Sequence, residues 1–404
     1  MTIRQSSNNA DRESSIGSFR LALLAVGTFT LGMDGFVLSG LLPEIAHDLG
    51  VSLAAAGQLI TIFSIVYAVG SPVIAALTGR WDRRIVLAGG MIVFLVGMVG
   101  QALGSRYGIV AGGRVLAAIG AAAFQSNAFA VAGILAGPER RGRTLAAVAA
   151  GTTISTVVGV PFGVLVGQTW GWRAAMWIIA GLAVITAVVV PLLPPVRLPL
   201  TSLAERLKVM VRPQVLAVLL SAVLVLLPGF IVLSYLPVIL APAITGVLLV
   251  VALVIRGTGQ VIGNQLTGRL VDARGPRPVL LIGAAGSTVC LAFLIPGRES
   301  VWSALLVIFV LGIFGGTLFI PNQARMFVAA PDVPTVAVGL LGSSLYASAA
   351  IGSALGGAAL AGSGVILMII VGVGLQVVGL LVVLVRGSAR SDRDRSERVL
   401  TAKT

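Results

Sequence analysis

Long apolar stretches alternate with short polar segments along almost the whole chain. Each stretch holds about 20 residues, which is the length that an α-helix needs to cross the hydrocarbon core of a bilayer. Alternation with a period of two residues, the pattern of barrel strands, is absent. The sequence therefore predicts an all-α integral membrane protein with twelve transmembrane helices, over residues 19–42, 54–77, 85–104, 107–136, 144–168, 174–195, 214–240, 243–266, 278–296, 302–327, 336–361 and 364–385.

The amino-acid composition supports this class. Hydrophobic residues make up 57% of the 404 positions, charged residues make up 10%, and the mean hydropathy is +1.05. A chain of this composition cannot fold as a water-soluble globule. The single cysteine, Cys290, and the single histidine, His47, give no basis for a disulfide framework or a Cys/His metal site. We therefore expect no metal and no cofactor.

The formal net charge of +14 does not indicate a nucleic-acid partner, because the basic residues lie in short clusters between the apolar stretches. With a cytosolic N-terminus, 23 of the 28 Lys and Arg residues fall in segments predicted to be internal and 3 in segments predicted to be external. This bias follows the positive-inside rule. We expect a multi-pass protein of the bacterial cytoplasmic (inner) membrane with both termini in the cytosol.

The two halves of the chain repeat each other. The sequence LTGR at 77–80 recurs at 266–269, the pattern G-x3-F-x2-N at 120–127 recurs at 315–322, and G-x3-G at 159–163 recurs at 352–356. Duplicated bundles with a binding site between them are typical of secondary transporters. We expect two pseudo-symmetric six-helix bundles in a chain divided into a cytosolic tail (1–18), an N-terminal bundle (19–195), a cytosolic central loop (196–213), a C-terminal bundle (214–385) and a disordered cytosolic tail (386–404).

One acidic residue, Asp34, lies in the middle of an apolar stretch. A carboxylate at membrane depth is costly unless it faces a cavity or a partner, so it marks a candidate functional site; a purely structural acid is the alternative. Asp34 is 8 residues from the external end of its helix at Leu42, and Arg114 is 7 residues from the external end of its helix at Tyr107. These spacings correspond to about 12 Å and about 10 Å. The two side chains are therefore expected at the same level.

The segment 268–277, GRLVDARGPR, resembles the G-x-L-x-D-x-x-G-x-R loop signature of the major facilitator superfamily. In the equivalent loop of the first half, Gly79 stands at the place of the signature's Asp and Asp82 at the place of its second Gly. Such loops are expected to fasten helix ends and to release them when the bundles move; an ordinary basic loop is the alternative. The expected gating residues are Arg80, Asp82, Arg83, Gly268, Asp272, Arg274, Gly275 and Arg277.

The predicted helix over 144–168 carries a small residue at every fourth position from Gly151 onward, so another helix can approach it closely. Its segment 159–163, GVPFG, is similar to the later part of the family's antiporter motif G-x8-G-x3-G-P-x2-G. With the sequence GWR at 171–173, it resembles the twelve-helix drug:proton antiporter branch, which includes actinomycete chloramphenicol exporters. The expected packing residues of this motif are Gly151, Gly159, Pro161 and Gly163.

The same resemblance extends to Arg114. The segment 114–120, RVLAAIG, is similar to the family's motif R-x2-q-G-x-G, with Ala117 at the place of the polar q. The resemblance implies that Arg114 is coupled to proton movement. We therefore expect Asp34 and Arg114 to form the proton-coupling site.

The second half contributes Arg256 and, one turn later, Gln260 to the apolar stretch 243–266. Both are expected to point into a central cavity, although an arginine that holds backbone carbonyls at a helix break is an equal alternative. In this fold the first, second, fourth and seventh helices approach the centre. The expected substrate-binding residues are Phe36, Gln58, Thr61, Gln125, Tyr235, Arg256 and Gln260.

Three classes of function are disfavoured by what the sequence lacks. The absence of a G-x4-G-K-[ST] phosphate loop argues against ATP as the energy source. No nucleophile and base are paired at membrane depth, as an enzyme would need, and no ring of like charges indicates a channel. We expect a monomeric transporter in the lipid bilayer that uses the proton gradient to export a lipophilic small molecule or antibiotic, chloramphenicol-like or multidrug. A proton-coupled importer of a sugar or other metabolite is the alternative.

Overall fold

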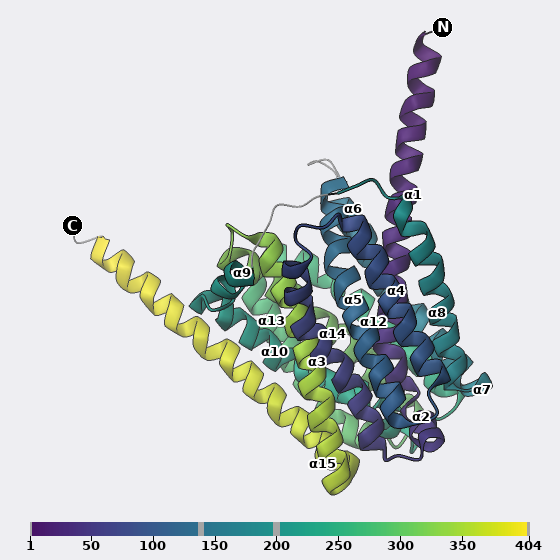
Figure 1. The fold of residues 1–404 in the computed structure, drawn as a ribbon. Coiled ribbons are helices and arrows are strands. Elements are labelled where there is room, and N and C mark those ends of the chain that lie inside the picture. The colour runs from purple at the N-terminus through teal and green to yellow at the C-terminus, as the bar shows by residue number, and fades with distance from the viewer. Residues whose placement is uncertain (1, 136–140, 197–202, 402–404) are drawn as a thin grey trace. The chain divides into compact units, whose positions relative to one another are not determined.

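The computed structural model describes residues 2–135, 141–196 and 203–401 of the chain (Figure 1). Within these residues all regular elements are helices, as the apolar stretches predict. The chain divides into two compact units: unit 1 comprises Met1–Lys208 with Gly246–Val254, and unit 2 comprises Val209–Thr245 with Ile255–Thr404. Residues 197–202 of the predicted central loop lie outside the described part.

Among the described residues, unit 1 contains ten helical elements before α9 and also the first residues of α12. The ten elements are α1 (Thr2–Gly40), α2 (Leu42–Leu49), α3 (Leu53–Leu77), α4 (Arg83–Leu103), α5 (Tyr107–Leu135), α6 (Arg141–Ile154), η2 (Ser155–Gly159), α7 (Val160–Trp170), α8 (Trp172–Val189) and η3 (Val190–Leu192). Helix α1 packs along α6 and α7, whereas α5 packs along α3 and α4. Helix α9 (Leu203–Met210) follows at the boundary between the units.

Unit 2 contains α10 (Pro213–Ser234), α11 (Leu236–Leu240), most of α12 (Val247–Arg274), α13 (Pro276–Gly297), α14 (Val301–Ala329) and α15 (Pro334–Thr401). Helix α10 packs along α14 and α15, and α13 packs along the same two helices. Buried aliphatic residues such as Val215, Leu280 and Leu341 form the core between them.

Eleven stretches of the described residues are long and apolar enough to cross a membrane. The last, Gly339–Val385, holds 47 residues, whereas one crossing needs about 20. Ser363 and Gly364 interrupt the helical backbone of α15, and Gly364 has a φ of +82°, a conformation that glycine adopts without steric cost. This break falls between the predicted helices 336–361 and 364–385. It divides α15 into two crossings, so the predicted twelve-helix architecture is confirmed.

The predicted helix over 144–168 appears as three consecutive elements. α6 passes into the π-helical turn η2, and α7 begins directly before Pro161. A proline inside a helix lacks the N–H for the ladder, and its ring crowds the carbonyl four residues earlier. The wider π turn immediately before Pro161 accommodates both effects, so the helix continues without a break.

Both ends of the chain are helical where the sequence predicts tails. Helix α1 begins at Thr2, and α15 continues to Thr401, so the segment expected to be disordered beyond residue 385 is helical as far as it is described (Figure 1). Acids and arginines in this segment are spaced three or four residues apart, as Asp394 and Arg398 are. This spacing supports a helix even without an apolar face.

Candidate functional site

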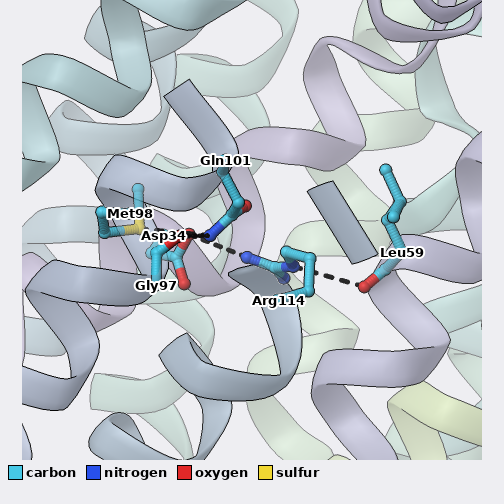
Figure 2. Close-up of polar contacts among 6 residues, drawn as sticks. All are labelled: Asp34, Leu59, Gly97, Met98, Gln101 and Arg114. Carbon is cyan, nitrogen blue, oxygen red and sulfur yellow. Dashed lines mark hydrogen bonds and ion pairs between the residues drawn. The ribbon is translucent and has the colours of Figure 1, made fainter. Parts of the chain in front are cut away.

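A buried ion pair between Asp34 and Arg114 lies in the interior of unit 1 (Figure 2). Arg114 Nη1 donates a hydrogen bond to Asp34 Oδ1 at 2.8 Å, and both side chains are completely buried. Asp34 comes from α1 and Arg114 from α5. The structure thus brings together the two residues that the sequence places at the same depth.

Arg114 has two further contacts with α3. Its Nε donates to the backbone oxygen of Leu59 at 3.3 Å, and its guanidinium carbon lies 4.2 Å from the centre of the Phe63 ring. Leu59 and Phe63 are four residues apart and therefore share one face of α3. The Asp34 carboxylate, in contrast, uses only one oxygen, since Oδ2 is buried without a hydrogen-bond partner among the described residues.

Gln101 is a polar residue of this region that the sequence analysis does not identify. It lies on α4 and is completely buried; its Nε2 donates to Gly97 O at 3.3 Å and to Met98 Sδ at 3.5 Å. Its Oε1 has no partner among the described residues. Figure 2 shows the nitrogen of its carboxamide on the side of Asp34 and the oxygen on the opposite side.

The packing of α4 against α5 explains the position of Gln101. A Cβ added at Gly113 would lie 2.8 Å from Gln101 Cγ, so the glutamine packs directly over the glycine that precedes Arg114. Gln101 lies 2 residues before the end of α4 at Leu103, whereas Gly113 lies 6 residues after the start of α5 at Tyr107, so spacing from the turn does not reveal this contact in the sequence. Gln101 also bears on the motif in which Ala117 replaces a polar residue, because a polar side chain is supplied here from the neighbouring helix.

The small-residue face of the helix formed by α6, η2 and α7 packs against α1. A Cβ added at Gly163 would lie 2.7 Å from Val37 and 2.8 Å from Met33, which immediately precedes Asp34. Gly151 lies against the backbone of Ala25, and a Cβ at Gly159 would lie 2.9 Å from the Phe29 ring. The motif thus forms close helix packing with the helix that carries the buried acid.

In the first-half loop, Asp82 and Arg83 connect the start of α4 to its surroundings. Asp82 caps α4 by accepting from the backbone N–H of Arg84 at 3.0 Å, and it also accepts from Val196 N at 3.3 Å. Burial alone would raise the Asp82 pKa, but these two backbone hydrogen bonds and the Arg84 charge hold it below its usual value. Arg80 is exposed.

Arg83 is buried and donates to three oxygen atoms. The acceptors are Thr78 O at 3.1 Å, Gly79 O at 3.0 Å and Asn127 Oδ1 at 3.1 Å. Gly79 occupies the place of the family signature's Asp, so here a backbone carbonyl accepts from the arginine. Arg83 thereby connects the end of α3 to α5.

The second-half loop has a different set of contacts. Asp272 and Arg274 are exposed, and neither side chain makes a hydrogen bond or ion pair with another described residue. Gly268 lies inside α12, which continues to Arg274. Gly275 has a φ of +79° and immediately precedes α13. Arg277 Nη2 donates to Leu384 O at 2.8 Å. Fastening through Asp272 is therefore not seen in this conformation, and its gating role stays a prediction.

A polar cluster joins three segments of unit 1 at the end where α2 lies. Asp48 on α2 accepts from Trp172 Nε1 at 3.0 Å and from Arg173 Nη1. Arg173 Nη2 also donates to Gly104 O at 2.7 Å, and its guanidinium carbon lies 4.4 Å from the centre of the Trp172 ring. In the sequence, Trp172 and Arg173 entered only through a family resemblance, and Asp48 and Gly104 gave no signal. We refer to Asp48, Gly104, Trp172 and Arg173 as the α2 clamp.

The remaining residues predicted to bind substrate differ in exposure. Thr61 is buried, and Phe36, Gln58 and Gln125 are half-buried; Gln125 Nε2 lies 3.5 Å from Thr152 Oγ1. Tyr235 is completely buried and donates to Ser353 O at 2.9 Å, so its hydroxyl is used in packing within unit 2. Arg256 and Gln260 are half-buried on α12. Roles in substrate binding stay predictions for all of them.

Comparison with known proteins gives one consistent result. A family model described as Major Facilitator Superfamily matches residues 24–253 and 240–403. The chain is 32% identical over 349 residues to a chloramphenicol resistance protein of Streptomyces lividans, covering 82% of this chain and 86% of that protein. It is 31% identical over 345 residues to the uncharacterized MFS-type transporter YbcL of Bacillus subtilis, covering 83% and 87% of the two chains.

A solved structure supports the same fold. The crystal structure of a mutant of the nucleoside transporter NupG superposes with a TM-score of 0.74 at 12% sequence identity and covers 91% of this chain and 99% of that one. The helical architecture, the family model over nearly the whole chain and the relatives above agree. This chain belongs to the major facilitator superfamily, a family of membrane transporters.

Proposed function

We propose that this protein is a proton-coupled exporter that removes lipophilic small molecules, such as chloramphenicol or other antibiotics, from the bacterial cytoplasm. Membership of a transporter family makes it a transporter and not an enzyme. The observation that carries the proposal is the ion pair of Asp34 and Arg114, buried in the interior of unit 1. The chloramphenicol resistance relative and the packing of the antiporter-like segment against α1 support export over import.

The geometry of the pair suggests how a proton could be coupled to transport. A proton on Asp34 neutralises the carboxylate, so Arg114 loses its counter-charge. Arg114 then keeps only the backbone oxygen of Leu59 and the Phe63 ring among the partners described above. Breaking a buried ion pair costs roughly 3–5 kcal/mol because a charge remains uncompensated. The protonated and deprotonated forms therefore favour different arrangements of α1, α3 and α5. This coupling of one proton to one conformational equilibrium is what an antiporter requires.

In the proposed cycle, Asp34 takes up a proton from the external side and releases it to the cytosol, while substrate moves in the opposite direction. The proton gradient supplies the energy, and the protein acts as a monomer in the bacterial inner membrane with both termini in the cytosol. The excess of arginines in the loops predicted to be internal supports this orientation.

Everted membrane vesicles test the direction of transport. They are prepared from a host that lacks its own drug exporters and that carries either the protein or an empty vector. With the lumen acidified, an exporter concentrates radiolabelled chloramphenicol, or another compound from a susceptibility panel, inside the vesicles. Collapse of the pH gradient should release it. Accumulation that needs no gradient, or that occurs only in right-side-out vesicles, would contradict the proposal and favour an importer.

A further inference from the structure

Arg256 lies near the middle of the membrane. It is 9 residues from the start of α12 at Val247, which corresponds to about 14 Å of a hydrocarbon core that is about 30 Å thick. A charged side chain at this depth is costly unless another charge or several hydrogen bonds compensate it. The question is therefore which group provides that compensation.

Unit 2 has no acidic residue at this depth. No Asp or Glu occurs between Val209 and Val271, and the acids of the rest of the unit lie at helix ends or in the C-terminal segment. In unit 1 the only acid in the interior of a membrane-spanning segment is Asp34, which is paired with Arg114. The interior charges are thus one carboxylate and two guanidinium groups. The described spans contain one positive charge in excess.

The contacts of Arg256 agree with this imbalance. Its Nε is buried without a hydrogen-bond partner, and none of the ion pairs among the described residues includes its guanidinium. From the sequence, an equal alternative is that Arg256 holds backbone carbonyls at a helix break. Helix α12, however, is continuous from Val247 to Arg274, so no break exposes carbonyls beside it.

Close packing of α12 on α14 holds the backbone around this arginine. The carbonyl oxygen of Arg256 lies against Gly312, and a Cβ added at Gly316 would lie 2.6 Å from the carbonyl oxygen of Gln260. Arg256 and Gln260 are four residues apart and therefore share a face of α12. Together they offer the planar fork of a guanidinium and the N–H2 group of a carboxamide, donors that suit a carboxylate or another oxyanion.

We propose that the transported molecule carries an acidic group, a carboxylate or a related oxyanion, and that Arg256 and Gln260 bind it. The ligand then supplies the negative charge that the spans lack, so the site binds lipophilic acids more tightly than their uncharged analogues. This inference rests on the proposed function and narrows it: among the lipophilic molecules proposed for export, acidic ones are the preferred substrates, and uncharged ones such as chloramphenicol bind more weakly. A lipid phosphate offers the same chemistry, and the experiment separates the two sources.

Binding is measured on the purified full-length protein in nanodiscs of phosphatidylcholine, where no anionic lipid is present. The probes are aromatic carboxylic acids of graded size, beginning with naphthalene-2-carboxylate, each paired with its uncharged primary amide. Thermal stabilisation gives the dissociation constant of each probe. We expect at least one acid to bind about tenfold to hundredfold more tightly than its amide, the range of a charge-assisted hydrogen-bonded pair.

Variants assign the preference to the proposed site. Arg256→Gln should bring acid and amide close to equal affinity, Arg256→Lys should keep part of the preference, and Gln260→Leu should reduce it. Arg106→Gln, which changes an exposed arginine in a loop, is the control and should keep the full preference. No preference for an acid in any pair, or a preference that survives Arg256→Gln, would overturn the inference.

Two further outcomes are informative. If phosphatidylglycerol stabilises the parent but not Arg256→Gln, while no acid does so, the site binds lipid phosphate and the substrate proposal is wrong. Because binding is measured without a proton gradient, it does not depend on export. An acid preference together with a failed vesicle experiment would support acid binding by Arg256 and Gln260 and overturn proton-driven export, so the two failures are distinguishable.

Discussion

The Asp34 carboxylate and the Arg114 guanidinium compensate each other inside unit 1, but not completely. Asp34 Oδ2 has no partner among the described residues, and neither has Gln101 Oε1 on the neighbouring helix. Two acceptors without donors are unfavourable in a buried site. A proton on Asp34 converts one of them into a donor. We infer that the Gln101 carboxamide turns over, which brings its oxygen to the side of Asp34 to accept from the protonated acid or from a water molecule between them.

Replacement of Gln101 tests this role. Gln101→Leu keeps a side chain of similar length over Gly113 but removes the acceptor, so protonated Asp34 loses a partner. We expect the rate of pH-driven export to fall by about tenfold, which corresponds to roughly 1.4 kcal/mol. The pH at half-maximal export should shift, whereas expression and downhill exchange should change little. A rate reduced equally at every pH would indicate a packing role only.

The helix formed by α6, η2 and α7 holds α1, and therefore Asp34, through contacts at glycines. Even a single Cβ at Gly163 would lie within 2.8 Å of side-chain atoms of Val37 and Met33, so a larger side chain must displace these two side chains and presses on α1. This segment resembles an antiporter motif, and its packing supports the antiport that we propose, because the position of the acid depends on the position of this helix.

A bulky substitution tests that dependence. Gly163→Leu should displace α1, at a cost of roughly 1–3 kcal/mol for overpacking, and should abolish coupled export while the protein still inserts into the membrane. Gly181→Leu is the matched control, because a Cβ at Gly181 on α8 meets no atom within 4 Å. Vesicle transport and the amount of inserted protein are measured for both. If Gly163→Leu exports substrate at the parental rate, this packing is not part of the transport mechanism.

The α2 clamp gives a prediction for pH. Burial alone would raise the pKa of Asp48, but the hydrogen bonds from Arg173 and Trp172 hold it below its usual value. A depressed pKa in the folded state means that the carboxylate stabilises the fold above its ordinary pKa of 3.8 and loses this contribution as the pH falls through the depressed value. The clamp should therefore weaken only in acid.

Thermal unfolding of parent and Asp48→Asn protein in detergent measures this contribution. We expect the variant to have the lower Tm at pH 7, and the difference to shrink as the pH is lowered below about 4. Trp172→Phe, which removes one donor and keeps the charge pair with Arg173, should give a smaller loss at pH 7. A Tm difference that stays constant down to about pH 3 would contradict the assignment to the Asp48 charge.

The two units are alike in helical architecture and unlike in charge. Asp34 is separated by the repeat offset from positions near 223–229, which are all apolar or glycine or proline, and Arg256 has no acid in its own unit at the same depth. The proposed roles of the two units differ in the same way. Unit 1 carries the proposed proton site, and unit 2 carries Arg256, the proposed binding partner of an acidic group on the substrate.

Apolar length and arginine placement were sufficient to predict the twelve helices, because membrane spans are set by bilayer thickness. The common depth of Asp34 and Arg114 was predictable, since helix rise converts sequence spacing into distance, and it indicated Arg114 as the partner of the acid. The contacts of Arg83 and Tyr235 were not predictable. Both depend on which backbone carbonyls lie nearby, and these follow from the rotation of each helix about its axis, which sequence spacing leaves open.

The proton-coupling role of Asp34 can be tested with one paired measurement in everted vesicles. Uphill accumulation under a pH gradient and exchange of substrate without a gradient are recorded for the parent, Asp34→Asn and Asp34→Glu. We predict that Asp34→Asn, which cannot take up or release a proton, loses uphill accumulation and keeps exchange, whereas Asp34→Glu keeps partial activity with a shifted pH optimum. Uphill accumulation by Asp34→Asn at the parental rate would contradict the proposed mechanism.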